Sequence, residues 1–387
     1  MKKKLSLFLL VLVLVTASLT GCGKPQETGS GSSDDVIKIG VFEPMTGAQA
    51  AGGEMTVEGI KLANEAKGEV LGKKVELVVV DNKSDKVEAA NAVSRLIDKD
   101  KVVAIIGSYS SSLSMSAGDI VKKAKVPAVG CSPTNPLVTL NNDYYFRVCF
   151  IDPFQGTVMA NYAVNDLGAK TAAIIQDVNQ DYSVGLSKYF IDSFKELTGD
   201  ENSIVEMTSY NTGDQDFTAQ LTNVKAKNPD VIFAPGNYGE CALLIKQARD
   251  LGIEVPVLGG DTWEAPEFLQ IGGNAVEGAV FSTHFTAEAP VTEKSTVFLD
   301  EYEAKFEKEA NAFAALGYDA YMVILDAIER GNSTDSEDIR DKLAETKDFV
   351  GATGNITIDE NGDAVKSAVI KKVDGGKFVY LTTVEPK

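Results

Sequence analysis

Residues 102–112 read VVAIIGSYSSS, an apolar run followed by a glycine and a series of small polar residues. An apolar run of this length is typical of a strand that is buried on both faces, as in a parallel sheet with helices on either side. The serines that follow are preferred helix-capping residues, and they lead into a helix-length amphipathic segment at 112–123. The stretch therefore predicts one strand–loop–helix unit of an α/β fold.

The same alternation of strand-length and helix-length segments continues on both sides of this stretch. It predicts strands at 37–42 and 75–80 with helices at 56–66 and 86–98, and a second series with strands at 172–175, 205–208, 231–234 and 256–258 and helices that start near Tyr182, Phe217, Glu240 and Pro266. Two such series predict the α/β class with two doubly wound parallel-sheet lobes. Helices are predicted at 295–309, 315–330 and 336–346, before a β meander over 356–358, 367–371 and 378–382 with its turn at Asn361-Gly362.

The N-terminus carries a targeting pattern. Three lysines at 2–4 precede an apolar segment at 7–15, which is too short to span a bilayer, and Leu19-Thr20-Gly21-Cys22 follows. This order resembles the bacterial lipoprotein signal, which implies removal of residues 1–21 and lipidation of Cys22. The Gly- and Ser-rich residues up to 35 are typical of a flexible tether. The alternatives are an ordinary cleaved leader or a single membrane anchor, and each places the folded part outside the cytoplasm.

Composition narrows the function classes. Removal of residues 1–21 leaves 366 of the 387 residues, more than one hydrophobic core usually holds, and shifts the formal charge from −19 to about −22. Such a charge disfavours nucleic acid and anionic lipid surfaces as partners. Cys131, Cys149 and Cys241 lack zinc-ligand spacing, so a Cys131–Cys149 bridge and buried free thiols both remain open. The single histidine, His284, makes His-rich metal sites and catalytic triads improbable and is expected on the surface or at a hinge.

Enzyme and cofactor motifs are missing from the sequence. There is no GxGxxG loop, and residues 68–73 fall one residue short of a Walker loop and lack its Ser or Thr. The abundant carboxylates of an acidic chain are more often a solvated face than an acid–base pair. We therefore expect no enzyme activity, no cofactor and no metal.

Five motifs, taken together, resemble one protein family. They are FEPMTG at 42–47, GSYSSS at 107–112, Phe146-Arg147 with Gln155-Gly156, Asp216-Phe217 and Glu277-Gly278, and they span most of the chain. The chain is similar to the substrate-binding lipoproteins of branched-chain amino acid ABC transporters, which have the periplasmic binding protein type I fold. The resemblance implies two hinged lobes with the ligand between them. Crossings near Ile151, Thr283 and Gly354 would divide the chain into lobe 1, residues 36–151 and 284–354, and lobe 2, residues 152–283 and 355–387.

Candidate site residues lie where predicted strands end, because open parallel sheets bind ligands outside the carboxyl ends of their strands. Ser111 opens a helix whose free N–H groups and positive dipole end suit a carboxylate, although helix capping is an alternative role. The resemblance implies that Ser132 and Thr134 hold the ammonium and carboxylate of an amino acid; a simple Pro-rich turn is the alternative. It places an acidic residue at Asp261, where a carboxylate would pair with the ammonium unless it only caps a short helix.

Further cleft residues follow from the same resemblance. Tyr182 matches a cleft tyrosine, Tyr109 would help to cover the ligand, and either Asn237 or Tyr238 would close the other side. Trp263 is either a wall of the pocket or part of the lobe 2 core. Residues 51–53 read Ala-Gly-Gly where leucine-binding members have an aromatic residue over the ligand side chain, so glycine leaves room there or removes a contact.

The sequence predicts a receptor that captures a free amino acid, branched-chain or otherwise apolar, and delivers it to an ABC permease without performing chemistry on it. We expect a monomer that is held at the membrane by its N-terminal lipid. Two alternatives remain: a receptor of the same fold for another small solute, such as an amide, a urea-like compound or an aromatic acid, and a sensory receptor subunit.

Overall fold

The computed structural model describes residues 36–386. The predicted signal segment 1–21, the lipidation site Cys22 and the tether up to residue 35 lie outside the described residues.

The first lobe is built on a six-stranded sheet in the order β2-β3-β1-β4-β5-β6. All neighbours are parallel except the short edge strand β2, which pairs antiparallel with β3. Its elements are β1 (Val36–Glu43), α1 (Ala50–Ala66), β2 (Glu69–Val70), β3 (Lys73–Asp81), α2 (Lys86–Arg95), β4 (Ala104–Ile106), α3 (Ser111–Ala124), β5 (Ala128–Gly130), β6 (Tyr145–Arg147), α9 (Glu293–Phe306), α10 (Ala312–Gly331), α11 (Ser336–Ala344), β12 (Phe349–Gly351) and β13 (Gly354–Ile356).

The second lobe is built on a seven-stranded sheet in the order β15-β14-β11-β10-β9-β7-β8. Strands β8, β7, β9, β10 and β11 are parallel, whereas β14 and β15 are antiparallel additions at one edge. Its elements are α4 (Asp152–Asn161), β7 (Ala172–Asp177), α5 (Asp181–Thr198), β8 (Ile204–Tyr210), α6 (Thr218–Lys227), β9 (Val231–Phe233), α7 (Tyr238–Asp250), β10 (Val257–Gly259), α8 (Pro266–Gly272), β11 (Val280–Thr283), β14 (Ala368–Asp374) and β15 (Lys377–Val384).

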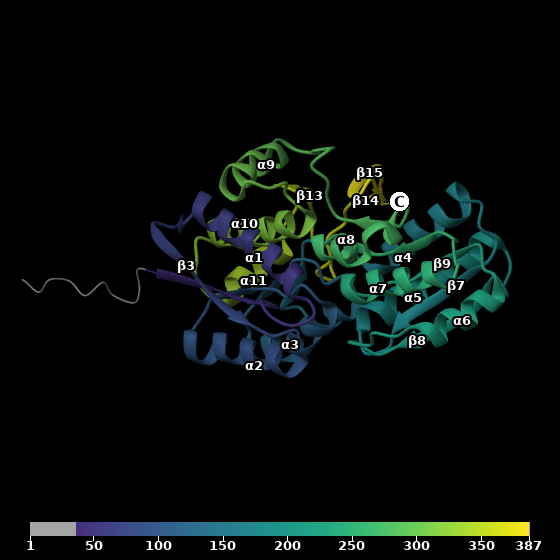
Figure 1. Ribbon diagram of the computed structural model, residues 1–387. Helices are drawn as coiled ribbons and strands as arrows, with labels where there is room; N and C mark the ends of the chain where they lie inside the picture. Colours follow the sequence, from purple (N-terminus) through teal and green to yellow (C-terminus); the bar gives the residue numbers. More distant parts are fainter. Residues whose placement is uncertain (1–35, 387) are drawn as a thin grey trace, which may run out of the picture. The chain divides into compact units, whose positions relative to one another are not determined.

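Successive residues of the central strands face opposite helix layers, which explains why strands such as β4 and β9 are apolar throughout. In β4, Ala104 and Ile106 join the core beneath α1 and α10, whereas Ile105 joins the core beneath α2 and α3. Figure 1 shows these two helix pairs on opposite sides of the first sheet. In β7, Ile174 and Ile175 likewise enter different cores of the second lobe. The predicted two-lobed α/β fold is confirmed, with antiparallel strands added at the sheet edges.

Both sheets have the same switch in strand order. In the first lobe, β3 lies on one side of β1, and the following strands, from β4 on, lie on the other side. In the second lobe, β8 lies on one side of β7, and the following strands, from β9 on, lie on the other side. At such a switch point the loops after the two strands leave in opposite directions and open a crevice at the carboxyl ends. Residues 107–110 follow β4, and residues 234–237 follow β9, so the sequence motifs lie at these crevices.

Helix α1 begins at Ala50, six residues before the predicted start at Thr56. Gly52 and Gly53 lower helix propensity, so the sequence pattern alone favours a loop there. The structure requires small residues at both positions, because a Cβ at Gly52 would lie 2.3 Å from the Tyr109 ring and one at Gly53 would lie 2.1 Å from the Pro44 carbonyl oxygen. Close packing outweighs propensity at this helix start.

The chain passes between the lobes at three places. The first passage connects β6 to α4, and the second follows β11. The third is predicted near Gly354, but the structure places it later: Ile356, Ile358 and Ala364 belong to the first-lobe core, and the chain enters the second sheet only at Ala368. The buried Arg147 holds this segment in the first lobe through an ion pair to Asp363 with an Nε–Oδ1 distance of 2.7 Å.

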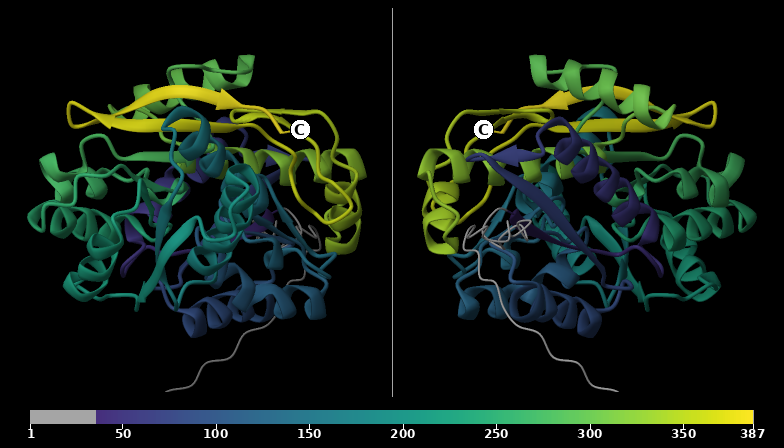
Figure 2. Two further views of the ribbon diagram at one scale, coloured as in Figure 1. Left: turned by 90° about the vertical axis from the view of Figure 1, so that its right-hand side faces the viewer. Right: turned by 90° about the vertical axis from the view of Figure 1, so that its left-hand side faces the viewer.

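The predicted C-terminal meander is wrong as one continuous sheet. Residues around Asn361-Gly362 form a tight turn closed by an isolated bridge between Ile358 and Ala364. The Gly362 carbonyl accepts a hydrogen bond from the Arg147 N–H of the first lobe, so this turn does not join the final strands. β14 and β15 instead form a hairpin at the edge of the second sheet, with positive-φ glycines at 375 and 376 in its turn (Figure 2).

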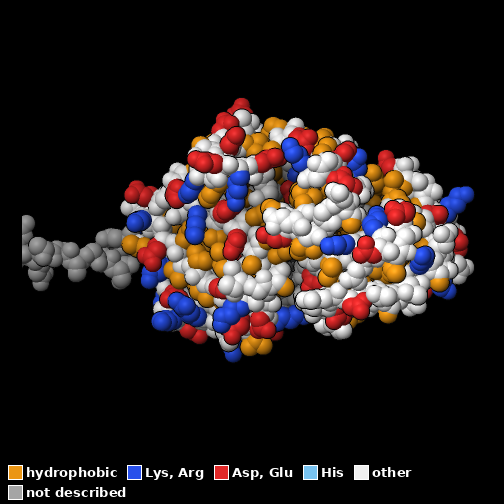
Figure 3. Space-filling model, in the orientation of Figure 1, with side chains coloured by type: hydrophobic (Ala, Val, Ile, Leu, Met, Phe, Trp, Pro, Cys, Tyr) orange, Lys and Arg blue, Asp and Glu red, His pale blue; other side chains and the backbone are white. Residues whose placement is uncertain are grey.

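The structure also decides between the two alternatives for the cysteines. Cys131, Cys149 and Cys241 are buried free thiols, so the bridge between the first two does not form. Acidic and basic side chains are interspersed over the face drawn in Figure 3. Within residues 36–386, no helix combines the length and apolarity needed to cross a bilayer, and no cluster of potential metal ligands occurs.

Candidate functional site

A small cavity of about 10 Å³ lies between the lobes at the carboxyl ends of both sheets. In this closed arrangement the cavity has room for about one water molecule, far below the roughly 300–1,000 Å³ typical of pockets for drug-sized ligands. Six predicted site residues line it together with three that the sequence interpretation did not name; the nine are Tyr109, Ser110, Ser111, Ser132, Gln180, Tyr182, Asn237, Asp261 and Thr262. The three additional residues, at 110, 180 and 262, are sequence neighbours of predicted ones.

Two of the three first-lobe serines at the cavity, Ser111 and Ser132, present opposite hydrogen-bonding groups to it. Ser111 Oγ accepts a hydrogen bond from the Asn135 N–H at 3.1 Å, which leaves its hydroxyl proton free to donate. Ser132 Oγ donates to the Tyr109 carbonyl at 3.1 Å, which leaves its lone pairs free to accept. Ser111 therefore suits an anion, and Ser132 suits a cation or an N–H donor.

Asp261 supplies a buried carboxylate from the second lobe, directly after β10. Its Oδ1 accepts hydrogen bonds from Gln155 Nε2 and Tyr182 OH, each at 2.8 Å, and its Oδ2 lies 3.1 Å from His284 Nε2. Burial, followed by the charges of Asp261 and Asp152, raises the pKa of Tyr182 well above its ordinary value, so this phenol stays neutral and donates. A carboxylate offers about four lone-pair sites, and one on Oδ2 remains for a ligand cation.

His284 is the hinge imidazole and not a surface residue. It directly follows β11 at the second passage between the lobes and is 3% exposed. Its ring packs against Phe150, beside the first passage, with centroids 3.9 Å apart and ring planes tilted by 31°. The structure places His284 at the passage where the hinge alternative puts it and adds its hydrogen bond to Asp261.

Tyr109 fills the space that Gly52 leaves open. Its ring packs against Gly52 and meets Phe313 edge-on, with centroids 4.8 Å apart. Burial raises the pKa of Tyr109 well above its ordinary value, so the hydroxyl is neutral. That hydroxyl and Asn237 Nδ2 have no hydrogen-bond partner within residues 36–386, although both atoms are buried beside the cavity. Buried polar atoms are normally paired, so both atoms favour a ligand with polar groups.

Two predicted site residues do not line the cavity. Thr134 is fully buried further along the loop, where its carbonyl accepts a hydrogen bond from the Asp152 N–H at 2.9 Å. Trp263 belongs to the second-lobe core and stacks on Phe268, with centroids 4.8 Å apart, so the core alternative holds. Tyr238, the alternative to Asn237, instead bridges the lobes: its hydroxyl accepts from the Ala51 N–H at 3.3 Å.

Two buried ionisable residues, Arg147 and Glu43, hold the cavity loops of the first lobe from behind. Arg147 donates to the carbonyls of Pro133 at 2.6 Å and Asn135 at 2.9 Å, and thereby braces the loop that carries Ser132. Glu43, at the end of β1, accepts a hydrogen bond from the Tyr109 N–H at 2.7 Å. Burial raises the pKa of Glu43 to about 8 against the opposing effect of this hydrogen bond, so its carboxyl is largely protonated at neutral pH.

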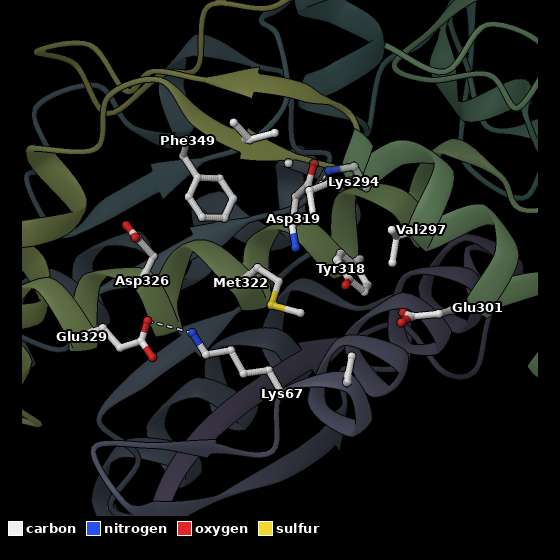
Figure 4. Close-up of a pocket in the computed structure, with 14 residues that line it drawn as sticks. Lys67, Lys294, Val297, Glu301, Tyr318, Asp319, Met322, Asp326, Glu329 and Phe349 are labelled. Carbon is white, nitrogen blue, oxygen red and sulfur yellow. Dashed lines mark hydrogen bonds and ion pairs between the residues drawn. The ribbon is translucent and has the colours of Figure 1, made fainter. Parts of the chain in front are cut away.

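A larger cavity of about 380 Å³ lies within the first lobe, between α1, α9, α10 and β12 (Figure 4). Charged side chains at its mouth are partly exposed and include the Lys67–Glu329 ion pair, with an Nζ–Oε2 distance of 2.7 Å. The cavity lies away from the carboxyl ends of the strands and receives no residue from the second lobe. It therefore lacks the convergence of buried polar groups that marks the interlobe cavity as the candidate site.

Comparisons with known proteins agree with this geometry. A sequence profile described as periplasmic binding protein matches residues 36–377. The Leu/Ile/Val-binding protein homolog 3 of Brucella melitensis is 31% identical over 89% of this chain and 93% of its own length. The crystal structure of the leucine-binding protein LivK of Thermotoga maritima is 48% identical with a TM-score of 0.88, over 90% of this chain and 99% of that one.

A second solved structure is LivJ of Streptococcus pneumoniae, the substrate-binding protein of a branched-chain amino acid transporter, in complex with isoleucine. It is 36% identical with a TM-score of 0.85 and covers 91% of this chain and 100% of its own. The interlobe cavity, the two doubly wound sheets and these similarities lead to one assignment. The chain belongs to the periplasmic binding protein family.

Proposed function

We propose that this protein captures a free amino acid with an apolar, preferably branched side chain between its lobes and delivers it to the permease of an ABC importer. The observation that carries the proposal is the opposition of Ser111, a free hydroxyl donor, and Asp261, a buried carboxylate, across one cavity. A zwitterion needs a donor at one end and an anion at the other. The names of LivK, a leucine-binding protein, and LivJ, in complex with isoleucine, support the choice of side chain.

Ligand capture is proposed to shut the cleft. Tyr109, Ser111 and Ser132 belong to the first lobe, whereas Tyr182 and Asp261 belong to the second, so a ligand contacts both sets together only when the lobes are closed. A ligand that binds the closed state more tightly shifts the population toward it. The permease can then distinguish loaded receptor from empty receptor by shape. The ligand leaves chemically unchanged, because the role is binding and release.

The ammonium contact is tested by changing ligand and protein in one cycle. We expect wild-type protein to bind leucine at least about 100-fold more tightly than 4-methylpentanoate, which has the same shape but no ammonium. Asp261→Asn should weaken leucine binding by a similar factor and nearly abolish the difference between the two ligands. Isothermal titration calorimetry measures all four affinities. Asp192→Asn, an exposed carboxylate of the second lobe, is the matched control and should bind like wild type.

Two outcomes contradict the clamp. Unchanged leucine affinity in Asp261→Asn would show that this carboxylate does not face the ammonium. Wild-type protein that prefers 4-methylpentanoate would instead be a receptor for small organic acids.

We also propose an extracytoplasmic monomer anchored through a lipid on Cys22, on the strength of the N-terminal sequence pattern. The full chain expressed in a bacterium should fractionate with membranes and incorporate labelled palmitate, whereas Cys22→Ala should do neither. Wild-type protein recovered without lipid in the soluble fraction contradicts the anchor. Light scattering measures the molar mass of the chain from residue 36 onward. A mass other than that of one copy would contradict the proposed monomer.

A further inference from the structure

Four hydrogen bonds outside the cavity join the lobes at one residue, Asp181, the first residue of α5. Its Oδ2 accepts from Lys86 Nζ at 2.9 Å and from Ser112 Oγ at 2.8 Å. Its N–H donates to Ser112 Oγ at 2.9 Å, and its carbonyl accepts from Asn135 Nδ2 at 2.8 Å. The three partners belong to the first lobe, so one second-lobe residue links three segments across the cleft.

Electrostatics explain why an acid occupies this position. The N-termini of α3 and α5 meet here, because Ser112 and Asp181 each lie in the first turn of their helix. Helix N-termini carry partial positive charge, so their approach is unfavourable unless an anion lies between them. Partial burial opposes the charge of Asp181, but the hydrogen bonds from Lys86 and Ser112 outweigh it and hold the pKa of this carboxyl below its ordinary value. The group is therefore ionised at neutral pH.

Asp181 does not contact the cavity, although both of its neighbours do. Gln180 and Tyr182 line the cavity, whereas the Asp181 side chain reaches across to the first lobe. Side chains at adjacent positions of one helix start therefore have different roles. The ligand cannot contact Asp181 directly, so any effect of this residue on binding must act through closure.

We infer that Asp181 is a closure latch, whose contacts form when the lobes shut and raise the affinity for the ligand that shuts them. The identity of the ligand rests on the proposed function, but the latch does not. An open state lacks these contacts, so their loss lowers the closing equilibrium constant and lowers apparent affinity by the same factor. The loss appears mainly as faster dissociation, because the latch opposes reopening.

Asp181→Asn tests the latch by removing the charge at nearly constant size. We expect affinities for leucine, isoleucine and valine to fall by one common factor of about five to thirty, with a matching rise in dissociation rate. A common factor is expected because the latch does not touch the side chain of the ligand. Asp192→Asn is the matched control: it lies on the same helix and pairs with Lys188 at 2.5 Å within the second lobe, so it should leave binding unchanged.

A double-mutant cycle tests whether Lys86 is the ion-pair partner of Asp181 in the latch. Lys86→Met should weaken binding less than Asp181→Asn, and the double variant should lose less than the product of the two factors, because they share one ion pair. Melting temperatures of the ligand-free variants should match wild type, which separates a latch from a fold defect. Wild-type affinity and dissociation rate in Asp181→Asn would overturn the inference.

A measurement without ligand tests the latch independently of the proposed function. Dyes on Asp98→Cys in the first lobe and Glu196→Cys in the second, in a Cys22→Ala background, report lobe motion by single-molecule energy transfer; both positions are exposed. Closed excursions should be about five- to thirtyfold shorter in Asp181→Asn than in wild type. Equal closed-state lifetimes in Asp181→Asn and wild type overturn the latch, even if wild-type protein binds no amino acid. If the lifetimes are shortened in Asp181→Asn but wild-type protein binds no amino acid, only the proposed ligand is overturned.

Discussion

Asp261 illustrates how neighbours prepare a single side chain for binding. Gln155, Tyr182 and His284 fix the carboxylate from three directions before any ligand arrives. A buried charge without such partners would be strongly unfavourable. With them, the carboxylate is oriented in advance, so binding a cation requires little reorganisation. Removal of one of these partners should therefore weaken binding even where the ligand does not touch it.

Glu43 gives a prediction about pH at the same scale. Its carboxyl holds a proton in the folded state up to a pKa of about 8, against 4.5 in an exposed chain. The unfolded state alone therefore loses this proton between about pH 4.5 and 8, so stability falls as pH rises through that window. Glu43→Gln has no proton to lose at this position. Between pH 5 and 8 its free energy of unfolding should therefore fall less than that of wild type, and the difference should exceed about 1 kcal/mol.

Urea unfolding at the two pH values measures this difference. Glu54→Gln, an exposed acid on α1, is the control and should follow the wild-type pH dependence. The same pH dependence in wild type and Glu43→Gln would show that the Glu43 carboxyl is already ionised in the folded state, which contradicts a pKa raised by burial.

At the scale of elements, the binding loops are short segments that start at strand ends and are supported from behind. The loop at 131–136 follows β5 and has no regular structure until Pro136. Arg147, on the neighbouring β6, supplies donors to two of its carbonyls and also donates to Thr139 at 2.8 Å. The next strand of the sheet therefore supports the loop, in addition to the cap that its own Asn135 provides.

Arg147→Met should remove this support. It leaves the Pro133 and Asn135 carbonyls and the Asp363 carboxylate buried without their partner, and breaking a buried ion pair typically costs about 3–5 kcal/mol. Urea unfolding followed by circular dichroism measures the loss. Lys188→Met, at an exposed ion pair, is the control and should cost less than about 1 kcal/mol. A loss below about 1 kcal/mol in Arg147→Met contradicts the bracing role.

Local patterns explain what could be predicted from the sequence. Apolar strands and the small polar residues after them indicate both sheets and place Ser111 and Ser132 at the carboxyl ends, because these features are short-range. Asp261 follows from the family resemblance. Sequence patterns miss the early start of α1, the third passage between the lobes and the separation of the Asn361-Gly362 turn from the final hairpin. Each depends on contacts between distant segments, such as Gly52 with Tyr109 and Arg147 with Asp363. The role of Asp181 escapes prediction for the same reason.

At the scale of the whole molecule, the lobes within residues 36–386 are in contact around the cavity. Polar contacts at Asp181 lie on one side, and the Tyr238–Ala51 hydrogen bond joins the lobes elsewhere. An apolar group of the first lobe, which includes Tyr109 and Phe313, belongs to the same buried cluster as Trp263 of the second. These interlobe contacts stabilise the closed state, and the ligand adds its own contacts to them. The measured affinity for the ligand therefore reflects both kinds of contact.

A crystal structure of the protein with leucine tests the central claim most directly. We predict leucine in the interlobe cavity, with its carboxylate about 3 Å from Ser111 Oγ and its ammonium about 3 Å from an Asp261 oxygen. Leucine bound elsewhere, or bound in this cavity with its ammonium directed away from Asp261, would contradict the claim.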